Sequence, residues 1–195
     1  MSSSSVYIFS PKEFLAKERL EKIRWWASMT QKPTMQGAYE ELIGELDQYL
    51  NFLDAKNDTR IFLYDAKETR YYLVYPVLAY QKAFIESDTC LSYELEKNPH
   101  QVLITDEFSY KVGPDEMYHK RYDKLIIELK HLKSEVLIPL HMGDVGKYGE
   151  IGFIILGKKK QNKHYTTNDI EFLESFAFSA TDMISTMMFQ TGIEE

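Results

Sequence analysis

The spacing of apolar residues changes along the chain, and this change divides the sequence into helical and extended segments. Apolar residues that recur at steps of three and four predict amphipathic helices over Pro11–Met29, Thr34–Ala55, Met117–Leu132 and Thr167–Phe189. The last helix has the clearest start. Thr166 can cap its free amides, and Asp169 lies near the positive end of the helix dipole.

Short runs rich in β-branched and aromatic residues predict strands over Arg60–Asp65, Arg70–Tyr75, Val136–Leu140 and Ile151–Leu156, with Val102–Thr105 as a shorter member. Between them, Glu86–Asn98 is expected to form a short helix that stops before Pro99. Strands and helices do not alternate regularly. The order therefore predicts an α+β domain, in which helices group against a central antiparallel sheet.

A run of glycines separates the last two predicted strands, with Gly143, Gly146, Gly149 and Gly152 at every third position. A phosphate-binding loop needs glycines that lead directly into a helix, usually followed by Lys and then Ser or Thr. Here Gly152 opens a strand, and no such Lys-Ser or Lys-Thr pair follows. The run therefore predicts the turn of a β-hairpin.

Composition and charge narrow the class of protein. The 195 residues, 44% hydrophobic and 27% charged, suit one globular domain with some additional helical material. A net charge of -7 without a concentrated basic face disfavours a nucleic-acid partner. No apolar run reaches the ~20 residues that cross a bilayer, and the serine-rich start lacks the features of a secretory signal. We therefore expect a cytoplasmic protein with no membrane partner.

Residues that could carry chemistry are few. The five histidines lie more than four residues apart and form no HExxH motif, so a helical zinc pair is excluded, while a site assembled in three dimensions stays open. Cys90 is the single cysteine, which excludes an internal disulfide and is more typical of a small packed residue than of a nucleophile. The basic segment 157–163 is expected to be a solvated loop. We expect no enzymatic activity, no resident cofactor and no metal.

In the last third of the chain, Pro139 lies near the end of one apolar strand and Gly152 near the start of the next, and Tyr165, Thr166 and Asp169 precede a long helix. This pattern resembles the C-terminal half of a GAF domain. That family shows an apolar strand ending in Pro-Leu, a strand opening with Ile-Gly, then Tyr/Phe-Thr-x-x-Asp and a long helix. The matching positions here are Pro139, Gly152, Tyr165, Thr166 and Asp169. Upstream, Glu94–Asp106 is similar to the family's segment of helix, turn, short strand and aspartate.

The resemblance implies an antiparallel sheet of about five or six strands, with the N- and C-terminal helices packed on one face and a pocket on the other. It assigns residues 33–195 to the GAF-like domain and 1–32 to a leader and helix. Cyclic-nucleotide members carry Asn-Lys after the strand, then Phe, then Asp-Glu. Lys158, Tyr165 and Asp169 match that signature, whereas Gly157 and Ile170 depart from it.

By resemblance, members of the family are mainly sensors of small molecules that regulate an attached signalling output domain. A cyclic nucleotide is the first expected ligand, and a ligand-free dimerisation module of a signalling protein is the alternative. The implied ligand contacts are Cys90, Ser92, Thr105, Asp106, Phe108, Tyr118 and His141. One enzyme of the family reduces methionine sulfoxide with several cysteines, and a chain with Cys90 alone cannot complete such a cycle by itself.

The terminal helices are expected to pair two chains into a homodimer. The predicted last helix has an apolar face that is long enough to cover the sheet and still leave side chains for a partner: Phe176, Ala180, Met183, Ile184 and Met187. The N-terminal helix was expected to contribute Ile23, Trp26 and Met29 to the same association.

Overall fold

A computed structural model of the chain describes residues 34–50, 58–76, 83–87, 89–109, 116–142, 149–159 and 163–191. In these ranges six strands form one antiparallel sheet in the order β3-β2-β1-β6-β5-β4. Their bounds are Thr59–Asp65 (β1), Arg70–Tyr75 (β2), Phe84–Glu86 (β3), Leu103–Ile104 (β4), Val136–His141 (β5) and Glu150–Leu156 (β6). The predicted α+β class and antiparallel sheet are confirmed.

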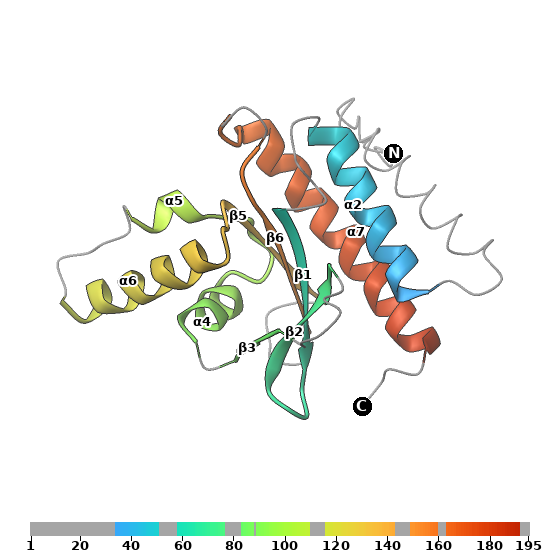
Figure 1. Ribbon diagram of the computed structural model, residues 1–195, viewed down its shortest axis with the longest axis horizontal. Helices are drawn as coiled ribbons and strands as arrows, with labels where there is room; N and C mark the ends of the chain where they lie inside the picture. Colours follow the sequence, from blue (N-terminus) through green and yellow to red (C-terminus); the bar gives the residue numbers. More distant parts are fainter. Residues whose placement is uncertain are drawn as a thin grey trace, which may run out of the picture.

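Helices cover both faces of this sheet (Figure 1). They are Met35–Leu50 (α2), Cys90–Lys97 (α4), Thr105–Phe108 (α5), Glu116–His131 (α6) and Thr167–Thr191 (α7). Helices α2 and α7 lie side by side on one face, as predicted for the terminal helices, and α4, α5 and α6 lie on the other. The predicted helix Pro11–Met29 lies outside the described residues. Among the helices described, none is long and apolar enough to cross a membrane.

The middle of the chain departs most from the predicted elements. The helix expected from Glu86 begins only at Cys90, because Glu86 ends strand β3 and its carboxylate accepts from Arg70 Nε at 3.0 Å. Thr89 caps α4 by accepting a hydrogen bond from the Ser92 amide at 3.3 Å. Strand β4 is shorter than predicted, because Thr105 already starts α5. Strand β3 and helix α5 are too short to show a periodic apolar pattern.

The predicted hairpin at the glycine run is confirmed, since β5 and β6 are antiparallel neighbours in the sheet. Gly143 and Gly146 lie outside the described residues. Gly152 has a φ of +149°, and a Cβ there would lie 2.0 Å from the Phe62 carbonyl oxygen of β1. Glycine at this position therefore allows β6 to approach β1 closely.

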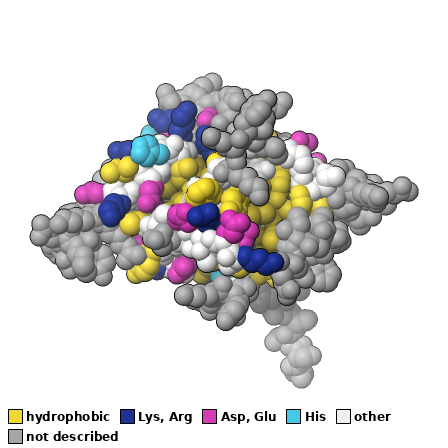
Figure 2. Space-filling model, turned by 60° about the horizontal axis from the view of Figure 1, so that its bottom comes forward, with side chains coloured by type: hydrophobic (Ala, Val, Ile, Leu, Met, Phe, Trp, Pro, Cys, Tyr) yellow, Lys and Arg dark blue, Asp and Glu magenta, His cyan; other side chains and the backbone are white. Residues whose placement is uncertain are grey.

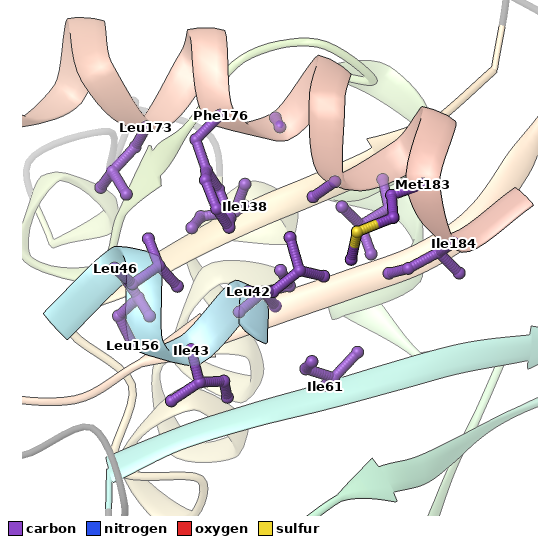
Figure 3. Packing of buried hydrophobic residues seen from close by; sticks show 14 of the residues in the cluster. Leu42, Ile43, Leu46, Ile61, Ile138, Leu156, Leu173, Phe176, Met183 and Ile184 are labelled. Atoms are coloured by element: carbon purple, nitrogen blue, oxygen red, sulfur yellow. The ribbon is translucent and has the colours of Figure 1, made fainter. Parts of the chain in front are cut away.

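Between the sheet and helices α2 and α7 lies the helix-side core (Figure 3). It consists of apolar side chains from both helices and from the strands, among them Leu42, Leu46, Ile61, Ile138, Leu156, Leu173, Phe176 and Ile184. At roughly 1.5–3 kcal/mol for each fully buried large apolar side chain, this layer is a main source of stability.

The apolar residues of α7 that were expected to remain for a dimer are buried in this core. Phe176, Ala180, Met183, Ile184 and Met187 are between 0% and 7% exposed within one chain. The prediction that these side chains remain available was wrong, because α7 packs against both β5 and α2. These two contacts bury more of the helix surface than packing against the sheet alone would. The dimer itself stays a prediction.

The opposite face of the sheet carries a second set of buried side chains, the α4-side core. Its members are Phe62, Tyr71, Leu91, Leu95, Leu103, Phe108, Tyr122, Leu125, Leu129, Leu137, Phe153 and Ile155. Phe62 and Phe153 stack with ring centres 5.0 Å apart, and Tyr71 meets Phe153 edge-on at 5.2 Å. The face expected to hold a pocket is therefore largely filled by apolar side chains in the described part of the chain.

An ion pair ties the end of the sheet to the start of α7. Lys159 Nζ lies 2.6 Å from Asp169 Oδ2, and both side chains are mostly buried. Burial alone would raise the pKa of Asp169, but Lys159 and the hydrogen bonds from Thr166 outweigh it, so this pKa is lowered. The segment 157–163 was expected to be solvated, which is wrong for Lys159. The resemblance had matched Lys158, which is exposed.

Figure 2 views the molecule from below and shows acidic side chains next to basic ones on the described surface, with apolar atoms between them. Together with the net charge of -7, this mixture accords with the expectation that nucleic acid is not a partner, which stays a prediction.

Candidate functional site

A hydrogen-bonded polar pair joins the buried Tyr71 of the α4-side core to the half-buried Glu150. The hydroxyl of Tyr71 donates a hydrogen bond to Glu150 Oε1 at 2.5 Å. Tyr71 belongs to β2 and Glu150 to β6, so the two side chains meet across the intervening strand β1. Tyr71 is only 1% exposed. An ionisable group inside an apolar core is costly unless it is hydrogen-bonded, which makes this pair unusual in its surroundings.

The surroundings shift the pKa of both groups. Burial raises the pKa of Glu150, the hydrogen bond from Tyr71 opposes that effect, and the charge of Glu96 adds to it. Burial also raises the pKa of Tyr71, and the bond to Glu150 raises it further. The proton therefore stays on the Tyr71 hydroxyl, which donates it in the hydrogen bond to Glu150. A carboxyl group with a pKa perturbed by burial is a candidate functional group.

The start of α4 adds hydroxyl groups beside this pair. Ser92 is 1% exposed and its Oγ donates to the Glu86 carbonyl oxygen at 3.3 Å. The Thr89 and Ser92 hydroxyls lie 3.1 Å apart. Hydrogen bonding with Ser92 also affects the pKa of Tyr71, in the lowering direction. Tyr71, Glu150 and Ser92 therefore form one polar group between the sheet and α4, which we call the Tyr71–Glu150 site.

Two further carboxyl groups lie close to α4. Glu128 of α6 accepts from the Leu91 amide at 3.3 Å, and burial raises its pKa against the effects of that bond and of Lys124. Glu94 is 3% exposed, and Asn98 Nδ2 donates to its Oε2 at 3.5 Å. These contacts make the surroundings of α4 rich in hydrogen-bond acceptors, which suits a ligand that carries amino or other N–H groups.

The seven predicted contact residues fall into separate places. Cys90 and Ser92 lie at the start of α4, where Cys90 packs against the α4-side core. Thr105, Asp106 and Phe108 lie together on α5. Thr105 Oγ1 donates to Ser134 Oγ at 3.3 Å. Asp106 is exposed, and Phe108, at 1% exposure, is a core residue.

His141 lies apart from the other predicted contacts. It ends strand β5 and contacts His100. The side chain of Tyr118 lies outside the described residues. Of the seven, Ser92 belongs to the Tyr71–Glu150 site, and Cys90 lies two residues before it at the start of α4. The backbone of His141 pairs with Glu150, while its ring contacts His100.

Sequence reasoning missed Tyr71 and Glu150. The sequence holds a signal for each residue. The alternation of Arg70–Tyr75 places Tyr71 and Leu73 on the same face of the strand. Glu150 is an acidic residue at the start of an apolar strand. Neither signal gives the distance between the two residues. Within the described ranges, no three His, Cys, Asp or Glu side chains lie close enough together to hold a metal ion.

Comparison with solved structures identifies the fold. The GAF domain of a phosphoenolpyruvate-protein phosphotransferase from Acinetobacter superposes with a TM-score of 0.55 at 10% identity, over 92% of this chain and 98% of that one. The chain has the GAF fold. A scan against protein-family models and a search of curated proteins find no match.

Two other solved structures match to a similar extent. A portion of a methyl-accepting chemotaxis protein gives a TM-score of 0.54 at 16% identity, over 90% of this chain and 98% of that one. A phycocyanobilin-bound GAF domain from a cyanobacterial phytochrome gives 0.52 at 8% identity, over 90% and 96%. At these identities the likeness shows the GAF fold and leaves the ligand to be argued from the residues.

Proposed function

We propose that this chain is a GAF-type sensory domain that binds a small molecule at the Tyr71–Glu150 site and regulates an attached signalling output domain. The observation that carries this proposal is the half-buried carboxyl group of Glu150, which is hydrogen-bonded to Tyr71 of the α4-side core. A core built only for stability gains more from apolar side chains in these positions. The neighbours in the structure search include a chemotaxis protein and a phytochrome domain, which is consistent with sensing.

The proposed ligand is a purine cyclic nucleotide. Exocyclic amino and ring N–H groups of a purine are donors, and they suit the acceptors Glu150 and Ser92. The aromatic rings of Phe62, Tyr71 and Phe153 supply apolar faces beside these acceptors. Cys90 and Ser92 are retained as proposed contacts, whereas the other five predicted residues remain predictions without a place in this site.

A ligand-free dimerisation module is the second candidate. The observation that favours it is the extent of apolar packing on the α4 side, where the twelve buried members of the cluster range from 0% to 8% exposed. A domain of this kind would act through its terminal helices alone. Past its first turn, the exposed residues of α7 in the described range are Glu171, Ser175, Phe178, Asp182 and Thr186, so an interface on this side would be mostly polar.

The test is native mass spectrometry of the freshly purified chain, followed by thermal-shift measurements with cyclic AMP and cyclic GMP. A ligand at 100 times its dissociation constant adds about 2.7 kcal/mol of stability. For a domain of this size, that corresponds to a rise in Tm of roughly 5–10 °C.

Glu150→Gln is the diagnostic variant, because it keeps an acceptor oxygen and removes the charge. We expect it to weaken binding by at least tenfold, and Glu171→Gln on the exposed side of α7 is the matched control. If neither nucleotide shifts the Tm and no small molecule copurifies, the sensory proposal is wrong and the dimerisation module takes its place. That second proposal in turn requires light scattering to show a dimer.

A further inference from the structure

The hydroxyl of Ser92 lies between the Tyr71–Glu150 site and the edge of the sheet. Ser92 is 1% exposed, and its Oγ donates to the carbonyl oxygen of Glu86, the last residue of β3, at 3.3 Å. Ser92 also reaches the Tyr71 hydroxyl. Burial dominates and raises the pKa of Tyr71, whereas the hydrogen bond with Ser92 acts in the lowering direction. A lowering effect identifies Ser92 as the donor, because a donor favours the phenolate form.

The register of β3 explains why the Glu86 carbonyl needs a partner outside the sheet. Strand β3 is at the end of the strand order and has no further strand beside it in the described part of the chain. The Ser87 amide donates to the Thr69 carbonyl at 3.2 Å, so the backbone groups of Ser87 face β2. Because this direction alternates along a strand, those of Glu86 face the outer edge. Ser92 therefore covers the outer side of an edge strand.

The single proton of the Ser92 hydroxyl cannot serve both acceptors at once. A serine hydroxyl donates one hydrogen bond and accepts two. Thr89 Oγ1 accepts from the Ser92 amide at 3.3 Å and keeps its own proton for Ser92 Oγ, 3.1 Å away. Glu86 and Tyr71 therefore compete for the Ser92 proton. While Tyr71 donates to Glu150, its oxygen is a strengthened acceptor, which draws the Ser92 proton towards the site.

We propose that Ser92 is a two-position switch that couples the Tyr71–Glu150 site to the edge strand β3. When Tyr71 loses Glu150 as its acceptor, its hydroxyl turns to donate to Ser92 Oγ, and the Ser92 proton then goes to the Glu86 carbonyl alone. A ligand that donates to Glu150 has this effect, so binding tightens the contact between α4 and β3. The ligand as trigger rests on the proposed function, whereas the switch itself operates in the free protein.

Strand β3 is the place where this switch reaches the protein surface. Phe84 is 46% exposed, and the guanidinium carbon of Arg70 lies 4.4 Å from the centre of its ring. Arg70 Nε also donates to both carboxylate oxygens of Glu86 at 3.0 Å. Glu86 therefore joins Ser92, through its carbonyl, to an exposed aromatic surface that an output domain can contact.

Hydrogen exchange of the free full chain tests the switch at the Ser87 amide, whose local opening separates β3 from β2. Tyr71→Phe removes one of the two acceptors, so Ser92 donates to Glu86 alone. We expect the Ser87 amide to exchange about threefold more slowly than in the parent, even though the variant loses overall stability. Tyr72→Phe is the control, because that hydroxyl donates to Glu68 in a contact exposed to solvent, and it should leave the rate unchanged.

Ser92→Ala separates the switch from a general effect of Tyr71→Phe. In the Ser92→Ala background, Tyr71→Phe should no longer slow the exchange of the Ser87 amide. Circular dichroism melting accompanies each variant, and Ser92→Cys, which has a similar size and only a weak donor, provides a second background.

The proposal is overturned if Tyr71→Phe leaves the Ser87 rate unchanged or raises it. It is equally overturned if the slowing persists in the folded variants that lack the Ser92 hydroxyl. Because these measurements need no ligand, a failure of nucleotide binding contradicts the proposed function alone.

Discussion

The two faces of the sheet are packed differently. On the helix-side face, the sheet meets α2 and α7 through apolar side chains that follow the helical and strand periods of the sequence. On the α4-side face, apolar side chains surround ionisable groups, with Glu150 bound to Tyr71 and Glu128 bound to the α4 amide of Leu91. Apolar packing stabilises the fold, whereas a polar group taken out of water reduces that gain unless it is hydrogen-bonded or paired with an opposite charge.

The largest expected effect comes from the ion pair that anchors α7 on the helix-side face. Asp169→Ala leaves the buried ammonium of Lys159 without its carboxylate, and removing one partner of a buried pair costs about 3–5 kcal/mol. Urea denaturation at pH 7 measures this loss. Lys158→Ala, at the exposed neighbour, should stay within about 0.5 kcal/mol of the parent.

The pH dependence of that loss has a definite sign. The folded-state pKa of Asp169 lies below its ordinary value of 3.8, so its contribution is present above that pH and is lost as pH falls through the folded value. The difference between parent and Asp169→Ala should therefore shrink in acid. A difference that grows below pH 4 would contradict the ion-pair explanation.

Next in size is a matched pair of core truncations, one on each face. Leu46 and Leu129 are both 0% exposed, the first in the helix-side core and the second in the α4-side core. If both cores are close-packed, Leu46→Ala and Leu129→Ala each cost about 2–5 kcal/mol. The same denaturation measures both losses. A clearly smaller loss of stability for Leu129→Ala would show that the α4-side core adjusts to the missing side chain and so has room for a ligand.

A smaller effect is expected from the polar pair itself. Tyr71→Phe removes the donor to Glu150 and leaves a half-buried carboxyl group without it, which costs about 1–3 kcal/mol. Tyr72→Phe is the control, because the hydroxyl of Tyr72 donates to Glu68 in a contact that is exposed to solvent. Equal losses in the two variants would remove the argument that Tyr71 and Glu150 form a special pair.

The smallest expected effects concern α5. Thr105 is buried and bonded to Ser134, so Thr105→Ala should cost about 0.5–1.5 kcal/mol. Asp106 is exposed, and Asp106→Ala should change stability by no more than about 0.5 kcal/mol. If Asp106→Ala also weakens binding of an identified ligand while Glu150→Gln does not, the ligand lies at α5 rather than at the Tyr71–Glu150 site.

Apolar period and turn chemistry by themselves determined much of the fold. Helix α7 and strands β1, β2, β5 and β6 were predicted within about two residues of their observed ends, because each shows a clear period and a clear start or stop. Their order also predicted the antiparallel sheet. The hairpin at the glycine run followed from local residues in the same way. Strand β3 and helix α5, with three and four residues, carry no such period and were missed.

Only the tertiary structure decided where polar groups meet. Tyr71 and Glu150 lie 79 positions apart in the sequence, and the strand order alone places them across β1 from one another. Strand β4 pairs only with Val136 and Leu137 of β5. The segment after α4 lies beside the rest of β5 and α7, and this brings His100 to His141. A period identifies which face of an element is apolar, but contacts between distant elements depend on register and strand order, which no local pattern encodes.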